Sequence, residues 1–493
     1  MKRLLTRCAA LGAGLMWTSL ALAAQPQFEP PQGAAPASRG TMASYFEEAD
    51  AKNDEAKQDE AAPAAPAPAA EEAKSEKSDN CGCANEESSC CDAAPTCGDS
   101  CADPSCGCPG CLGCECKLCI DDCWPFTCCC KPGDPWTLQS CLGTPCCCCA
   151  EGMTYGGWLS MGFYTNNDPL SFHDNDLLSF WDNPGDLNFD QEWFWIEKKP
   201  KTDSCSWDWG YRADLVYGVD AQKTQAFGNS GFPNPQGYDN GWDNGRYGWA
   251  LPQLYADFAK GDLDIKVGHF FTLVGYEVIP KTGNFFYSHS YTMFNSEPFT
   301  HTGVLATYKI NDELSVMGGW VLGWDTGYDQ FRDGNAIHSG FIYQLDKNIK
   351  YSYMMTAGDL GWRGDGYSHS NVVDFTLSKK WEYVFQSDLL TTDTNTNALN
   401  DALSYGANNY LFYTINDCWK WGTRMEWWRS NQVTNDMTSF YELTTGLNYK
   451  YSANLVVRPE VKYNWCPGEA QVENTAGGDF SHVIFGMDAI YTF

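Results

Sequence analysis

Apolar and polar positions alternate with a period of two through most of the chain after residue 151. The clearest window runs from Cys205 to Asp220, where every odd-numbered position is apolar or aromatic and every even-numbered position except Val216 is polar, charged or glycine. Successive side chains of a β-strand point to opposite faces, so this pattern predicts a strand with one apolar and one polar face. A helix would scatter the same residues around its circumference.

The alternation recurs in enough windows to predict about 16 antiparallel strands. The windows are 153–164, 187–198, 204–219, 250–260, 262–271, 301–310, 313–324, 335–345, 348–358, 370–379, 381–390, 404–415, 417–429, 439–450, 454–465 and 482–493. Short turns alternate with longer connections rich in Gly, Asn and Asp, which is typical of barrels in the outer membrane.

Strand length and aromatic content separate this pattern from that of a soluble β-sandwich or propeller, whose strands average about 5–6 residues. The predicted strands are about twice as long, and 65 of the 72 aromatic residues lie in residues 151–493. We therefore predict an all-β fold, a transmembrane antiparallel β-barrel of about 16 strands (roughly 12–18), over residues 151–493. The last window alternates up to Phe493. We expect Phe493 to act as the barrel-insertion signal, because outer-membrane barrels typically end on an aromatic strand residue.

The N-terminal residues 1–23 have the pattern of a cleavable signal peptide. Lys2, Arg3 and Arg7 precede an apolar stretch that ends in Ala21-Leu22-Ala23. That stretch is short for a membrane-spanning helix, and no later window has 18 consecutive apolar residues. Export without a spanning helix is compatible with a barrel in the outer membrane, which is the predicted location.

Two segments precede the predicted barrel. Residues 24–80 are rich in Ala, Pro and Glu and are expected to form a disordered linker. Residues 81–149 hold 21 of the 25 Cys and no His. Because export leads to an oxidising compartment, we expect disulfides in this Cys-rich segment, including bridges to other envelope proteins. Soft-metal binding and the absence of any ordered role are the alternatives.

The formal net charge of −31 excludes a general nucleic-acid binder, which needs clustered Lys and Arg. Polar positions of the predicted strands supply charges of both signs, which suggests a field across the lumen. The candidate pore-lining residues are Asp208, Arg212, Asp214, Lys266, Arg424, Glu426, Arg458, Glu460 and Lys462.

A family resemblance is carried by residues 267–310, which read VGHFFTLVGYEVIPKTGNFFYSHSYTMFNSEPFTHTGVLATYKI. The segment resembles the OmpL-like β-barrel porin family, common in planctomycete-type bacteria. The features it shares are Gly268 with Phe270-Phe271, Gly275-Tyr276-Glu277, Asn284 with Phe286-Tyr287-Ser288, and Pro298 with Thr300-His301-Thr302-Gly303. The resemblance covers about 151–493 and leaves the Cys-rich segment outside. It implies an outer-membrane barrel and a porin, without a defined solute.

Residues 272–300 are too irregular for a strand and too aromatic for a solvated loop. Long loops within a compact fold are commonly functional. We expect this one to fold into the lumen as a constriction, with Glu277, Lys281, His289 or Glu297 at its narrowest point. A cap outside the barrel is the alternative.

These features favour a porin-like channel for passive diffusion of small hydrophilic solutes. The alternative is a structural envelope protein in which the barrel anchors a cross-linking Cys-rich segment. No Gly-x-Ser-x-Gly motif or phosphate-binding loop is present, so we expect no enzyme activity. We likewise expect no catalytic, cofactor-binding or metal site. The expected partners are outer-membrane lipid, small solutes or ions, disulfide-linked envelope proteins and further copies of the chain.

Overall fold

The computed structural model describes residues 134–143, 152–165, 180–181, 183–201, 206–226, 237–330, 333–393, 401–432, 436–467 and 481–493. The predicted signal peptide and linker lie outside the described residues, as does most of the Cys-rich segment.

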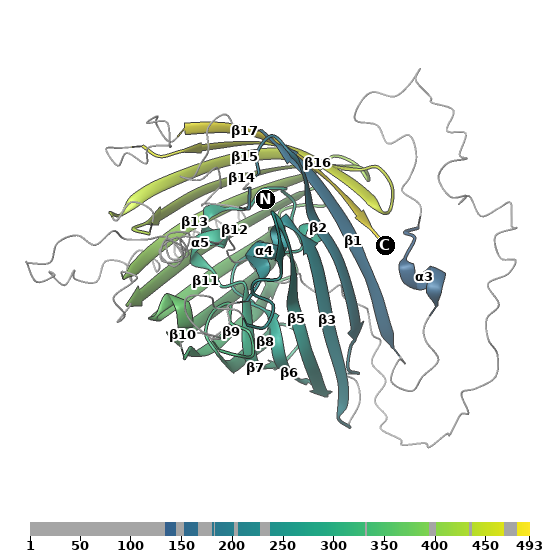
Figure 1. The fold of residues 1–493 in the computed structure, drawn as a ribbon, viewed down its shortest axis with the longest axis vertical. Coiled ribbons are helices and arrows are strands. Elements are labelled where there is room, and N and C mark those ends of the chain that lie inside the picture. The colour runs from purple at the N-terminus through teal and green to yellow at the C-terminus, as the bar shows by residue number, and fades with distance from the viewer. Residues whose placement is uncertain are drawn as a thin grey trace, which may run out of the picture.

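Sixteen long antiparallel strands form a closed barrel (Figure 1). They are β1 (Met153–Tyr164), β2 (Leu187–Lys198), β3 (Asp208–Gly218), β5 (Tyr247–Lys260), β6 (Leu263–Phe271), β7 (Thr300–Lys309), β8 (Leu314–Val321), β9 (Asn335–Asp346), β10 (Ile349–Asp359), β11 (Asp365–Thr376), β12 (Trp381–Asp393), β13 (Ala402–Thr414), β14 (Trp419–Ser430), β15 (Thr438–Lys450), β16 (Leu455–Trp465) and β17 (Ser481–Thr492). Each pairs with its neighbours in the chain, and β1 pairs with β17 to close the ring. The two-residue strand β4 (Asp243–Asn244) pairs only with β5. The predicted fold class is confirmed.

Most strand boundaries lie close to the predicted windows, but two strands begin elsewhere. Strand β3 begins at Asp208 instead of at 204. Strand β11 begins at Asp365 instead of near residue 370. Its ladder with β10 is continuous from Thr356↔Ser368 to Asp359↔Asp365. Backbone pairing with a neighbour therefore extends this strand beyond the part that the apolar pattern marks.

The two faces of the wall differ in the way that the alternation predicts. On β17 the outward side chains of Val483, Phe485 and Met487 are 58%, 42% and 42% exposed in the isolated chain, whereas the inward Ile484 and Asp488 are each 1% exposed. An outward apolar band of this kind is suited to lipid contact.

The two ends of the barrel have connections of different length. At one end the strands join through short turns, such as residues 261–262 and 347–348. At the other end the connections include the long segment 272–299. The described part of the chain contains no helix long and apolar enough to span a membrane.

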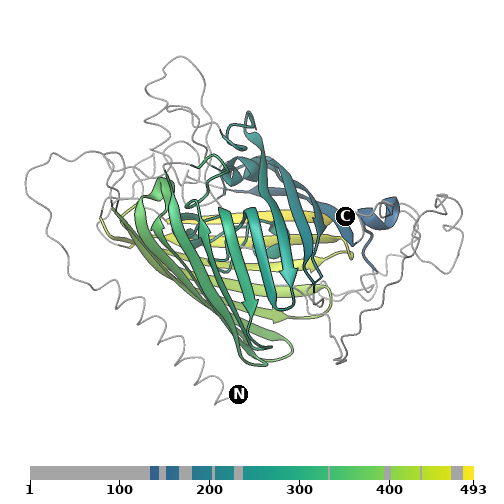
Figure 2. The same ribbon diagram turned by 90° about the horizontal axis from the view of Figure 1, so that it is seen from below.

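Helix α3 (Leu138–Leu142) lies outside the barrel, beside the start of β1 and the end of β17 (Figures 1 and 2). The Trp136 N–H donates to Asn454 Oδ1 at 2.8 Å, in the turn before β16. The Gln139 side chain donates to the Met153 carbonyl at 2.9 Å. The segment that enters the barrel is thus attached at the short-turn end.

Three short helices lie within the ring of strands: α4 (Val219–Thr224), the 3-10 helix η1 (Lys281–Gly283) and α5 (Tyr291–Ser296). Ala221 of α4 and Phe294 of α5 belong to one buried cluster that also contains Ile279 and the inward side chains of Trp193 and Phe271. The interior of the barrel therefore has a hydrophobic core of its own, and residues 272–299, here called the inward loop, supply much of it.

Candidate functional site

The inward loop is held in the lumen by apolar burial at many positions. The side chains of Ile279, Tyr287 and Tyr291 are fully buried, and Phe286 and Phe299 are 3% and 1% exposed. Phe286 packs against Val372, Val384, Tyr410 and Phe412, inward residues of β11, β12 and β13. Burial of this many large side chains accounts for why a segment without regular structure lies inside rather than over the barrel.

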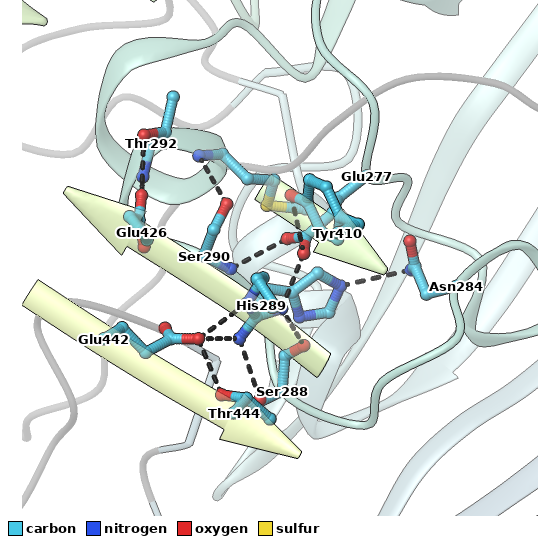
Figure 3. A network of polar contacts seen from close by, with 12 residues as sticks. Glu277, Asn284, Ser288, His289, Ser290, Thr292, Tyr410, Glu426, Glu442 and Thr444 are labelled. Carbon is cyan, nitrogen blue, oxygen red and sulfur yellow. Dashed lines mark hydrogen bonds and ion pairs between the residues drawn. The ribbon is translucent and has the colours of Figure 1, made fainter. Parts of the chain in front are cut away.

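A buried chain of four charged groups joins the loop to the wall. Figure 3 labels two of them, Glu277 and Glu442, among their polar neighbours. Arg424 on β14 places Nη1 2.6 Å from Glu277 Oε1 in the loop and Nη2 2.5 Å from Glu442 Oε1 on β15. Lys462 on β16 lies 3.0 Å from the second oxygen of Glu442. Arg424, Glu442 and Lys462 are no more than 1% exposed. Alternating signs let each charge offset the desolvation of its neighbour.

Two wall carboxylates accept hydrogen bonds from loop backbone. Glu426 on β14 accepts from the N–H groups of Tyr291 and Thr292, both at 2.7 Å. Glu460 on β16 accepts from the N–H groups of Tyr287 and Ser288 at 2.8 and 3.1 Å. Each carboxylate thereby satisfies two adjacent buried donors, which fixes the loop in position along the barrel.

Further contacts fix the N-terminal half of the loop. Arg458 on β16 is 2.5 Å from Asp488 on β17 and also donates to the carbonyls of Lys281 and Asn284 at 3.0 and 2.5 Å. Lys281 lies 3.2 Å from Asp220 in α4. The loop is therefore tied to the wall and to α4 by charged groups of both signs.

Burial shifts the pKa of ionisable loop residues. It lowers the pKa of His289 well below its ordinary value, and the nearby positive charge of Lys281 lowers it further. The imidazole is therefore neutral at pH 7, with Nε2 3.3 Å from the Val278 carbonyl. Burial raises the pKa of Glu297 well above its ordinary value, and the charge of Asp388 on β12 raises it further.

A protein-family model described as "Putative beta-barrel porin-2, OmpL-like" matches residues 152–493. The chain belongs to this family. Its members are outer-membrane β-barrels of porin type, so this is a porin-family barrel of the outer membrane.

Solved porin structures resemble the porin-family barrel at low sequence identity. OmpT of Vibrio cholerae is 11% identical with a TM-score of 0.45, and the match covers 69% of this chain and 99% of that chain. The channel DcaP of Acinetobacter baumannii is 9% identical with a TM-score of 0.46, covering 69% and 97%. An anion-selective porin from Comamonas acidovorans is 10% identical with a TM-score of 0.47, covering 69% and 99%. A search of curated protein sequences finds no match.

The candidate lining residues of the porin-family barrel fall into two groups. Five of them face the inward loop and are nearly fully buried: Arg424, Glu426, Arg458, Glu460 and Lys462. The other four lie in β3 and β6. Within that group Arg212 is 2.6 Å from Asp214, and Lys266 lies over the Tyr255 ring at 4.5 Å. Asp208 accepts from the Lys201 N–H at 2.8 Å. Which of the nine meets a passing solute stays a prediction.

The expected field across the lumen stays a prediction, and three of the positive charges that would contribute to it are paired locally. Arg212, Arg424 and Arg458 each pair with a carboxylate on the same or a neighbouring strand. Opposite charges this close cancel most of each other's potential at a distance. The wall therefore does not separate these charges onto opposite sides.

The four loop candidates all lie in the lumen. Glu277 and Lys281 form the ion pairs described above. His289 contacts the Val278 carbonyl within the loop. Glu297 accepts a hydrogen bond from the Gln386 side chain at 2.5 Å. Phe493 closes the β1–β17 seam, where its N–H and C=O each bond to Gly157 at 2.9 Å.

Several charged residues of the interior were not among the sequence candidates. Glu442, the centre of the buried ion-pair chain, occupies a polar position of its strand, so the alternation could have marked it. Other inward pairs lie near the short-turn end, with side chains that are 34–44% exposed: Lys350–Asp374 and Lys420–Glu382. The pattern assigns all of these to the lumen face, but it does not tell which ones the inward loop covers.

Proposed function

We propose that this porin-family barrel is a channel for passive diffusion of small hydrophilic solutes and that the inward loop is its constriction. The observation that carries this proposal is the set of buried polar contacts that fixes the loop to the wall. Arg424 joins Glu277 to Glu442 while Glu426 and Glu460 accept from loop backbone. A loop fixed in this way sets a constant cross-section, which a sieving channel requires.

Half-exposed charges support a wet entrance on the short-turn side of the loop. The pairs Lys350–Asp374 and Lys420–Glu382 line this part of the interior. Charged pairs of this exposure are usual in contact with water. Because both signs are present, we propose a channel of weak charge selectivity, with the excess of acids in the chain mildly favouring cations.

Planar-bilayer conductance of the full-length protein tests the proposal. We expect discrete steps from the wild type and larger steps from a variant in which residues 275–297 are replaced by a short Gly-Ser turn. Heat-denatured protein is the control for leakage. If the loop-deleted barrel conducts and the wild type does not, the native barrel is sealed and the channel proposal is wrong.

A second proposal is that the barrel anchors the Cys-rich segment for cross-linking. Trp136 and Asn454 are joined by two hydrogen bonds, at 2.8 and 2.6 Å, which attach the end of that segment to the barrel. Cys141 nearby is exposed and carries a free thiol. Electrophoresis of envelope fractions with and without reductant tests this role. A shift to larger species without reductant is expected, and a monomer in both lanes would contradict it.

A further inference from the structure

A second polar cluster lies between the end of the inward loop and the wall, apart from the Arg424 ion-pair chain. Gln386 on β12 donates from Nε2 both to Glu297 Oε1 at 2.5 Å and to Asp388 Oδ2 at 2.7 Å. The two carboxylates therefore meet at a single amide nitrogen. Asn408 on β13 lies directly opposite Gln386 in the ladder, which brings its side chain to the same place. We call Glu297, Gln386, Asp388 and Asn408 the oxygen cluster.

The oxygen cluster is buried and contains two carboxyl groups at one place. Its four side chains are between 0% and 2% exposed. Among the described residues, no Lys or Arg forms an ion pair with Glu297 or Asp388; the Arg424 guanidinium is engaged by Glu277 and Glu442. An unpaired buried carboxylate costs several kcal/mol, so two at one place require a compensating positive charge.

The buried polar atoms without hydrogen-bond partners indicate what kind of positive charge the oxygen cluster accepts. Within the described part of the chain, Glu297 Oε2, Asp388 Oδ1, Gln386 Oε1 and both amide atoms of Asn408 have no hydrogen-bond partner. Buried polar atoms are nearly always satisfied. One proton shared between the carboxylates would leave the two amide oxygens unsatisfied. A cation that accepts several oxygen ligands would satisfy the carboxylate oxygens and the two amide oxygens together.

We propose that the oxygen cluster binds a hard divalent cation, Ca²⁺ in particular, and that the ion fastens the inward loop to β12 and β13. Ca²⁺ takes about 6–8 oxygen ligands from carboxylates, Asn and Gln carbonyls and water, in irregular geometry. Two carboxylates and two amide oxygens supply four such ligands. The described residues contain no group of three or more His, Cys, Asp or Glu placed to hold a metal. The oxygen cluster is not a group of that kind, because only two of its four ligands are carboxylates and the other two are amides.

The backbone at Gly275, near the start of the inward loop, packs against Glu297 of the oxygen cluster. Gly275 has φ +91, and a Cβ there would lie 2.0 Å from Glu297 Oε2. The unpartnered oxygen of Glu297 is thus packed against glycine backbone at the start of the loop. An ion at the cluster would fix this oxygen, and with it both ends of the loop.

Metal analysis of the full-length protein tests the proposal. The protein is folded into detergent with Ca²⁺ or with a chelator, desalted, and assayed by mass spectrometry for bound metal. We expect about one Ca²⁺ per wild-type chain and at least tenfold less in the E297Q/D388N double variant. E382Q is the matched control, because Glu382 lies on the same strand and face but pairs with Lys420. This control should retain the ion.

Folding is checked separately by the heat-dependent electrophoretic mobility of the barrel. The amide substitutions preserve side-chain size and supply N–H donors to the neighbouring oxygens, so the double variant is expected to fold without the ion. Folding in chelator should lower the thermal unfolding temperature of the wild type and leave that of the double variant unchanged. A folded wild type that holds no Ca²⁺ after folding in its presence would overturn the proposal. Equal retention by the folded double variant would also do so.

Discussion

Arg424 on β14 and Glu277 in the inward loop form an ion pair across 147 residues of sequence, with Nη1 2.6 Å from Oε1. The guanidinium is fully buried and the carboxylate is 5% exposed. Arg424 also bonds Glu442 and the Ser288 carbonyl, so one guanidinium joins two parts of the loop to the wall.

Replacement of Arg424 by Met should release the loop. The change leaves Glu277 and one oxygen of Glu442 buried without their positive partner, so we expect a loss of about 3–5 kcal/mol in the free energy of unfolding. Urea titration of the folded protein in detergent measures it, and bilayer recordings should show larger or noisier steps. Lys420→Gln is the control on the same strand, because its half-exposed pair with Glu382 is worth about 1 kcal/mol or less. Similar losses in the free energy of unfolding of both variants would contradict the proposal that Arg424 fixes the loop to the wall.

Gly275→Ala should destabilise the loop through both backbone and packing. The residue has φ +91, which side-chain-bearing residues rarely adopt, and the added Cβ would lie 2.0 Å from Glu297 Oε2. We expect a loss of about 1–3 kcal/mol, seen as a lower urea midpoint. Gly318→Ala on β8 is the control, because no atom lies within 4 Å of its Cβ position. An unchanged midpoint for Gly275→Ala would show that the loop can relax around the methyl group.

Asp325 should make stability depend on pH near neutrality. It lies between β8 and β9 and accepts from the N–H groups of Phe299 and Thr300 at 2.7 and 3.0 Å. Burial raises the pKa of Asp325 from 3.8 to about 7. The folded state then binds more protons than the unfolded state between these values. The stabilising contribution is full below pH 3.8 and is lost as the pH rises through about 7.

Asp325→Asn tests this dependence. The amide keeps an oxygen for both backbone donors and carries no charge at any pH. The variant should therefore gain stability relative to the wild type between pH 4 and pH 8, by up to about 4 kcal/mol. Urea midpoints of both proteins across this range measure the difference. Asp329→Asn, at an exposed position in the same connection, should show no such trend; a difference for Asp325→Asn that is constant with pH would refute the assignment.

Phe493→Ala should slow assembly of the barrel. The Phe493 ring lies over Gly157 and 5.5 Å from the Phe194 ring, at the seam where β1 meets β17. Loss of the ring removes apolar contact at the step that closes the barrel. The folded fraction in membranes, followed over time by electrophoretic mobility, should rise more slowly than in the wild type. Phe485→Ala, an exposed outward aromatic on the same strand, controls for lost lipid contact, and equal rates in the two variants would contradict a special role of Phe493.

The sequence by itself determined the barrel. Period-two alternation assigns side chains to two faces, and this information is local, so strands such as β1 and β2 could be predicted with their observed ends. It also placed Arg424, Glu426 and Glu460 on the lumen face, because the face follows from position in the strand alone.

Only the tertiary structure decided what those lumen residues contact. Glu277 and Arg424 meet because β6, β7 and β14 belong to one closed ring and the connecting loop turns inward, and no local pattern encodes that meeting. The same holds for Glu297 and Asp388, which are ordinary polar positions in the sequence and share the Gln386 amide in the fold. Side-chain direction is a property of the strand, whereas the burial and pairing of a charge depend on what the rest of the chain places in front of it.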